Sequence, residues 1–184
     1  MTAHECPQPE PPLTPSRSVE GEASILHPLV AAALARHGMR HRAIACDPQY
    51  ADTAAFCEHY HCPPGDAANT IIVATKTDPA RFAACIVLPT TRLDVNKCVR
   101  QLMGSRLSFA SAEQTLALTG MQIGGVVAVG LPEDVPVFID DAVFALGEVL
   151  LGGGNRSSKL MVGPEELLRM PQARRILGLG VAHA

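Results

Sequence analysis

Two adjacent glycines form a segment of this sequence in which main-chain groups could take part in catalysis. The segment Thr119–Val127 places Gly124 and Gly125 side by side at the entrance to an apolar run. Glycine allows a ligand to approach the backbone, and outward-pointing N–H groups at such a place can stabilise an oxyanion. The same pair is also typical of an ordinary β-turn with a bulge, which residue types alone favour.

A second glycine run precedes two cations. Gly152-Gly153-Gly154 ends an apolar stretch and is followed by Arg156 and Lys159. Arginine and lysine beside a glycine turn suit an anionic ligand. A hairpin turn with solvated charges is the alternative interpretation.

The segment Cys57–Cys62 contains two thiols and two imidazoles, which are side chains that zinc prefers. A helix would direct His59 and His61 to different faces, and no second pair of ligands lies elsewhere in the chain. We therefore expect no metal and no cofactor, and interpret the segment as a helix end with exposed histidines and one buried cysteine. A zinc protein built on this segment is the weaker alternative.

The sequence lacks the motifs typical of serine hydrolases and of nucleotide-binding folds. No G-x-S-x-G elbow is present to hold a nucleophilic serine. No G-x-G-x-x-G follows the first predicted strand, and no G-x-x-x-x-G-K-[ST] occurs. Dinucleotide-binding and P-loop folds therefore lose their main support.

Composition bounds the remaining functions. The chain has 184 residues, of which 47% are hydrophobic, and this suffices for one sizeable core. A net charge of −3 and the absence of tryptophan exclude a broadly basic or base-stacking nucleic-acid binder, so contacts with nucleic acid must be local. We expect a cytoplasmic protein with reduced thiols and no partner in a membrane or in DNA.

The elements that would hold these residues follow from periodicity and capping signals. Residues 1–24 are rich in Pro, Ser and Glu and predict a disordered tail, and 25–184 predict one domain. Residues 69–76 and 81–89 predict a hairpin buried on both faces, because each contains an unbroken run of apolar residues. Helices are expected at 26–38, 52–60, 95–103, 112–119, 140–146 and 164–170, and further strands at 41–46, 124–131, 135–140, 147–154 and 158–162. The pattern indicates an α+β fold with a mixed, barrel-like β-sheet and flanking helices.

Several segments, taken in order, resemble one family. They are Asp52-Thr53-Ala54-Ala55, Ala68–Val73, Ala83–Pro89, Arg92–Lys97, Ser111–Thr115, Thr119–Val126, Pro136–Asp140 and Gly152–Lys159. Together they are similar to the YbaK/prolyl-tRNA-synthetase-associated domain family of trans-editing aminoacyl-tRNA deacylases. The resemblance covers about residues 43–170.

The resemblance implies hydrolysis of the ester that joins a wrong amino acid to the 3′ end of its tRNA. An aminoacyl ester is already activated, so a positioned water and backbone donors can suffice without a protein nucleophile or metal. The implied catalytic residues are Asn69, Gly124, Gly125 and Val126. The residues implied to bind the substrate are Thr70, Val127, Ala128, Asp94, Gly153, Arg156 and Lys159. The implied partners are mischarged tRNA and an aminoacyl-tRNA synthetase.

Two positions depart from the family pattern. Many members carry a lysine where this chain has Asn69, which keeps hydrogen-bonding capacity without the charge. Many also carry Ser/Thr-Pro where this chain has Val127-Ala128. Lys76 lies too far along the same strand to substitute for the lysine. These departures motivate a second hypothesis, in which the chain is a non-catalytic module that binds aminoacyl-tRNA, a small ligand or a synthetase.

Overall fold

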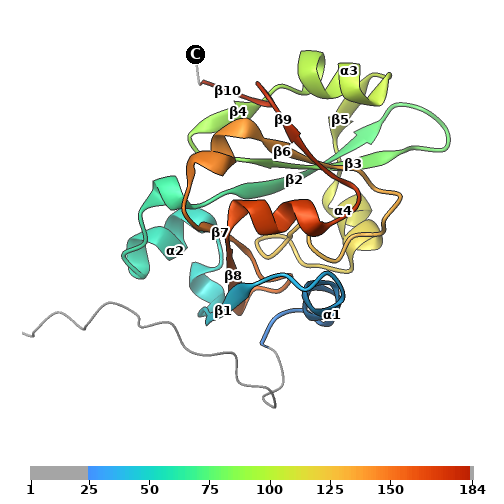
Figure 1. Cartoon of the computed structure of the whole chain (residues 1–184). Coiled ribbons are helices and arrows are strands. Elements are labelled where there is room, and N and C mark those ends of the chain that lie inside the picture. The colour runs from blue at the N-terminus through green and yellow to red at the C-terminus, as the bar shows by residue number, and fades with distance from the viewer. Residues whose placement is uncertain (1–24, 183–184) are drawn as a thin grey trace, which may run out of the picture.

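The computed structural model describes residues 25–182, and the tail expected at residues 1–24 lies outside them (Figure 1). The described chain contains helices and three β-sheets, which confirms the α+β class. Its sheets include both parallel and antiparallel pairs, so the expected mixture is also confirmed. Among residues 25–182, no helix combines the length and the apolar character that crossing a membrane requires.

The central sheet has the strand order β5-β2-β3-β6-β9. The predicted hairpin is present, because β2 pairs antiparallel with β3 and Asn69 lies opposite Val87. Strand β6 pairs parallel with both β3 and β9. The bounds are β2 Asn69–Thr75, β3 Phe82–Val87, β5 Leu107–Phe109, β6 Val137–Asp140 and β9 Ala173–Ile176.

Both faces of this sheet are buried, as the apolar runs predicted. Along β3, Ala84 and Ile86 point into one hydrophobic cluster, which also contains α1 side chains. Cys85 and Val87 point into a second cluster on the other face. Side chains of successive strand residues point to opposite faces, so a strand that is apolar throughout requires a cover on each side.

A smaller antiparallel sheet, β1-β8-β7, lies beside the start of β2. An isolated bridge pairs Ala67 with Leu150, and the Ala68 N–H donates to the Leu150 carbonyl at 2.9 Å. The described strands do not close into a barrel, because the three sheets stay separate. The bounds are β1 His41–Ala45, β7 Val149–Gly152 and β8 Ser158–Val162, and the third sheet joins β4 Thr91–Leu93 to β10 Gly180–Ala182.

The helices begin and end near the predicted residues. Asp52 precedes α2, and Ser111 and Gln114 form a capping box at α4. The segment predicted at 95–103 starts as a π-helical turn, Val95–Val99. The Asp94 carboxylate caps this turn by accepting a hydrogen bond from the Lys97 N–H. The bounds are α1 Pro28–Arg36, α2 Thr53–His59, α3 Arg100–Met103 and α4 Ala112–Thr119, with 3-10 turns at Pro48–Tyr50, Pro64–Asp66, Asp141–Ala145 and Pro164–Arg169.

The strand predicted over 124–131 is wrong. This segment is a buried loop without strand pairing, although Val127, Ala128 and Val129 are fully buried in the core. Gly124 and Gly130 have φ values of +91° and +96°, which interrupt an extended conformation. The β-branched residues of this segment therefore predicted its burial correctly, but the strand conformation that they also predicted is wrong.

Candidate active site

A cavity of about 610 Å³ opens where the start of α2, strand β2 and two glycine loops meet. Its volume falls within the ~300–1,000 Å³ typical of small-molecule sites. The lining residues are Asp52, Thr53, Ala54, Ala68, Asn69, Thr70, Ile71, Ile72, Phe109, Ala110, Thr115, Ile123, Gly124, Val126, Gly152 and Lys159. Five of the residues predicted for the site therefore lie together on this wall: Asn69, Thr70, Gly124, Val126 and Lys159.

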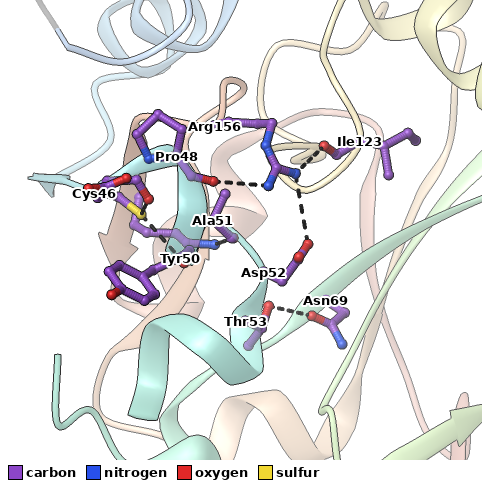
Figure 2. Close-up of polar contacts among 11 residues, drawn as sticks. Cys46, Pro48, Tyr50, Ala51, Asp52, Thr53, Asn69, Ile123 and Arg156 are labelled. Atoms are coloured by element: carbon purple, nitrogen blue, oxygen red, sulfur yellow. Dashed lines mark hydrogen bonds and ion pairs between the residues drawn. The ribbon is translucent and has the colours of Figure 1, made fainter. Parts of the chain in front are cut away.

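The side chain of Asn69 is oriented by its neighbour on α2. The Thr53 hydroxyl donates a hydrogen bond of 2.9 Å to Asn69 Oδ1 (Figure 2). The amide oxygen accepts this bond, so the Nδ2 group points away from Thr53. Nδ2 has no acceptor among the described residues and keeps both of its N–H donors. Asn69 therefore presents a fixed hydrogen-bond donor at the cavity wall.

The Thr70 hydroxyl is the second polar group in this place. Its Oγ1 atom is buried and has no hydrogen-bond partner within residues 25–182. A buried hydroxyl without a partner costs about 1–3 kcal/mol. Since Thr70 lines the cavity, a bound polar group or water would satisfy it there.

The glycine loop, residues 122–126, has its main chain partly unpaired. The Gly125 N–H donates to the Gln122 carbonyl at 3.0 Å, so this donor, which the sequence assigned to an oxyanion, closes a turn instead. The N–H groups of Gly124 and Val126 have no acceptor among the described residues. Gly124 and Val126, both in the cavity lining, therefore carry the donors that stay available.

The glycine loop and the turn 152–156 pack with their main chains in contact. A Cβ on Gly125 would collide with the Asn155 carbonyl, and one on Gly152 would collide with the Gly125 carbonyl. The Gly154 N–H donates to the Gly125 carbonyl at 2.7 Å. These glycines are required because no side chain fits between the two segments.

Arg156 ties the glycine loop to the start of α2. Its Nη1 donates to the Ile123 carbonyl at 3.1 Å and its Nη2 to the Pro48 carbonyl at 3.0 Å (Figure 2). Nη1 also lies 3.9 Å from the Asp52 carboxylate. The family resemblance implied that Arg156 binds substrate, whereas its guanidinium is directed at protein oxygens and the residue lies outside the cavity lining.

Lys159 is buried and lies on the cavity wall. Its side chain extends from β8, its ammonium donates to the Ala51 carbonyl, and Nζ lies 5.4 Å from the centre of the Phe56 ring. The residue is only 3% exposed. Burial lowers the pKa of Lys159 below its usual value, because desolvation disfavours the charged form.

The other residues predicted to bind substrate lie elsewhere. Val127 and Ala128 are buried in the hydrophobic core rather than in the cavity lining. The Asp94 carboxylate accepts from the Lys97 N–H and caps the π-helical turn. The Gly153 N–H donates to the Ser158 carbonyl, and the Gly153 carbonyl accepts from the His27 N–H. None of these four contributes to the lining.

The lining residues that were not predicted for the site include Thr53, Phe109 and Ile123. Thr53 was named as part of a helix start and of a segment that resembles the family, and its contact with Asn69 is visible only when α2 and β2 come together. Phe109 lies on β5, a strand too short to produce a recognisable period. Ile123 precedes the glycine pair, and its exposure of 55% could not be read from an apolar side chain.

The cysteine- and histidine-containing segment forms the end of α2, as predicted. Cys57 is buried, and the exposed His59 stacks on Tyr50 with ring centres 3.7 Å apart. Over residues 25–182, no group of three or more His, Cys, Asp or Glu side chains is arranged to hold a metal ion. Burial raises the pKa of the Cys57 thiol.

Comparison with known proteins defines the class. The aminoacyl-tRNA editing domain family matches residues 47–170, and the chain belongs to this family. Uncharacterized protein YwhH of Bacillus subtilis (strain 168) is 35% identical over 72 residues, which cover 39% of this chain and 46% of that protein. The match therefore spans less than half of this curated relative.

Solved structures share the fold. Hypothetical protein APE2540 superposes with a TM-score of 0.74 at 22% identity, over 83% of this chain and 99% of that one. A protein described as a candidate trans-editing enzyme for prolyl tRNA synthetase gives a TM-score of 0.69 at 23% identity, over 82% and 96% of the two chains. At these identities the likeness establishes the YbaK-like fold.

Proposed function

We propose that this chain hydrolyses the ester bond of mischarged aminoacyl-tRNA in trans. One observation carries the proposal: the Asn69 amide, fixed by Thr53, shares a cavity with the unpaired main-chain donors of Gly124 and Val126. Family membership supports aminoacyl-tRNA as the substrate class. The proposal includes a cytoplasmic location and a synthetase as a candidate partner.

The reaction needs only water as a co-reactant. Water adds to the ester carbonyl carbon, and the carbonyl electron pair collects on oxygen. The N–H donors of Asn69, Gly124 and Val126 stabilise this oxyanion more strongly than they bind the neutral carbonyl. Collapse breaks the bond to the ribose oxygen, which takes one proton, and the amino acid leaves as a carboxylate after releasing the other proton to solvent.

The rim of the cavity suits the terminal nucleoside of the tRNA. Phe109 and Ile123 line the cavity and are 59% and 55% exposed. An exposed aromatic ring can stack a base, which contributes about 1–3 kcal/mol per base. Phosphate contacts would come from local cations, of which Arg92, Lys97, Arg100 and Arg106 form one group in the sequence.

A deacylation panel tests the proposal. Transfer RNAs charged with Ala, Ser, Thr, Cys or Pro are incubated with wild type, Asn69→Ala and the matched control Asn96→Ala, whose side chain is exposed on the π-helical turn. We expect wild type and the control to cleave at least one ester, and Asn69→Ala to be slower by about a hundredfold, the size seen when an oxyanion donor is removed.

The same panel separates the non-catalytic alternative. A binding module would leave every ester at the uncatalysed rate while it still binds tRNA in a salt-sensitive manner. That result would reject hydrolysis and favour the binding module that the departures at Asn69 and Val127-Ala128 suggest.

A further inference from the structure

Lys159 is a buried cation without a carboxylate partner. Its residue exposure is 3%, and no Asp or Glu oxygen within residues 25–182 lies within 4.0 Å of its Nζ. The ammonium has three N–H donors, and one protein acceptor, the Ala51 carbonyl, is in contact with it. Buried charges are normally paired or fully hydrogen-bonded, because desolvation of an ion is costly.

The charged neighbours of Lys159 do not supply the missing partner. Cys46 follows β1 and Cys57 lies on α2, and burial raises the pKa of both thiols, so these groups favour the neutral form. Asp52, the residue before α2, attracts the ammonium from a distance and Arg156 repels it, but the Asp52 carboxylate forms its ion pair with Arg156 and none with Lys159. The part of Lys159 that remains exposed faces the cavity that it lines.

Lys159 and Asn69 are fixed by the same short segment. The lysine donates to Ala51, and Asn69 accepts from Thr53, two residues further along the chain. Both side chains line the one cavity, although they come from β8 and β2. The segment 51–53 therefore holds an ammonium and an amide donor at a common wall.

From this juxtaposition we propose that Lys159 is a catalytic residue whose ammonium binds the ester carbonyl oxygen and stabilises the oxyanion together with Asn69. This inference rests on the proposed function. A tRNA phosphate is the less suitable ligand, because an ammonium buried to this extent reaches a group inside the cavity and not the backbone that runs over the surface.

The ammonium takes no proton from the reaction in this scheme. Water adds to the carbonyl carbon, the negative charge develops on the carbonyl oxygen beside the Lys159 N–H groups, and collapse of the adduct breaks the ester bond as described above. The lysine ends the cycle in the charged state in which it began. A preorganised cation stabilises such a charge without reorganisation during the reaction.

Three substitutions at one position test the assignment. Lys159→Met removes the charge at similar length, Lys159→Gln keeps a donor for the Ala51 carbonyl, and Lys159→Ala leaves room for an added amine. Lys76→Met is the matched control, because Lys76 is exposed just beyond the far end of β2. The measurements are kcat and KM on the ester that wild type cleaves, and Tm for folding.

We expect kcat to fall about a hundredfold in Lys159→Met and Lys159→Gln, with KM changed much less and folding retained. Added methylamine should restore activity to Lys159→Ala and leave Lys159→Met unchanged, a result that a structural lysine would not give. In wild type, the rate corrected for uncatalysed hydrolysis should decline at alkaline pH, starting below the usual lysine range, because burial lowers the pKa of Lys159.

Two outcomes would overturn the inference and differ from each other. If wild type and Lys76→Met cleave the ester and folded Lys159→Gln keeps kcat within about threefold, Lys159 is not catalytic while the proposed function stands. If wild type cleaves none of the charged tRNAs, the proposed function itself fails and the role of Lys159 fails with it.

Discussion

The guanidinium of Arg156 occupies the space in which a side chain at Gly124 would lie. The two residues come from different segments, and Arg156 also binds the carbonyl of Ile123, the residue before the glycine (Figure 2). Gly124 has φ +91°, a backbone conformation that L side chains rarely adopt. Arg156 therefore sets the position of the main-chain donors at the cavity by packing against a residue that has no Cβ.

Replacing Gly124 by alanine should impair catalysis while the protein still folds. The new methyl group would displace Arg156 and strain the loop at positive φ, which moves the unpaired N–H groups of residues 124 and 126. We expect deacylation to fall at least tenfold, since small misplacements of positioning groups carry penalties of this size or more. Gly65→Ala is the matched control, because a Cβ there meets nothing within 4 Å. Equal rates for both variants would contradict the prediction.

Thr53 and Asn69 should behave as one unit in kinetics. Thr53→Val removes the donor that holds Asn69 Oδ1, so the amide loses its fixed orientation, and we expect kcat to fall about tenfold. Thr53→Ser keeps the hydroxyl and should stay near wild type. In a double-mutant cycle, Thr53→Val should add little to Asn69→Ala, because its effect passes through the amide. Additive losses would show that Thr53 acts independently.

Glu166 should support stability at neutral pH and not in acid. Hydrogen bonds from the Arg40 side chain and main chain lower the pKa of Glu166 below its ordinary value of 4.5. Arg169 adds an ion pair at 2.7 Å. A carboxyl with a lowered folded-state pKa stabilises the protein above its unfolded-state pKa, and this contribution is lost as pH falls through the folded-state value.

The measurement for Glu166 is urea unfolding of Glu166→Gln from pH 7 to pH 3. We expect a loss of about 1–3 kcal/mol at pH 7, in line with a buried charge-assisted hydrogen bond, and a smaller difference below pH 4.5. Glu133→Gln breaks an ion pair with Arg36 whose two side chains are both 58% exposed, and it should cost less than about 1 kcal/mol. A constant difference across pH would contradict the assignment.

Titration of the buried Cys85 thiol should lower the free energy of unfolding at alkaline pH. Burial raises the pKa of this thiol to about 12, whereas its ordinary value is 9.0. Between these values the unfolded chain releases the proton and the folded chain keeps it, so the free energy of unfolding falls as pH rises above 9. The slope from one such group approaches about 1.4 kcal/mol per pH unit.

Unfolding under reducing conditions at pH 8, 9.5 and 10.5 tests this dependence. Cys85→Ala should be less stable than wild type at pH 8 because it removes a buried sulfur, and its stability should then decline less steeply with pH. Part of the slope should persist, since burial also raises the pKa of Cys46, Cys57, Cys62 and Cys98. Identical slopes for the two proteins would assign the alkaline effect to those other thiols.

The sequence predicted the elements whose signals are local. The capping box at Ser111 and the hairpin formed by β2 and β3 depend on residues within a few positions of each other, and both are present. The segment 124–131 was misread because its valines report burial, while its fold depends on positive φ at Gly124 and Gly130. Strand β9, which pairs with β6, was not predicted because Arg174 and Arg175 interrupt the apolar pattern typical of a strand.

The site divides in the same way. Asn69, Gly124 and Lys159 could be named from residue type and resemblance, and all three line the cavity. The purpose of Arg156 could not be read from the sequence, because its acceptors at Pro48 and Ile123 are 108 and 33 residues away. Charge alone predicted an anionic ligand, whereas packing directs the guanidinium to main-chain carbonyls.

The contact between the glycine loop and the turn 152–156 involves main chain on both sides. Apart from Arg156, which packs against Gly124, this contact depends on bare main chain and not on the chemistry of the surrounding side chains. We therefore expect conservative exchanges at wall residues outside these two segments, such as Ile71 and Ala110, to leave the loop that carries the unpaired N–H groups in place. The shape of the cavity and the geometry of its donors are separable properties of this fold, and an engineer could alter the first while the second stays fixed.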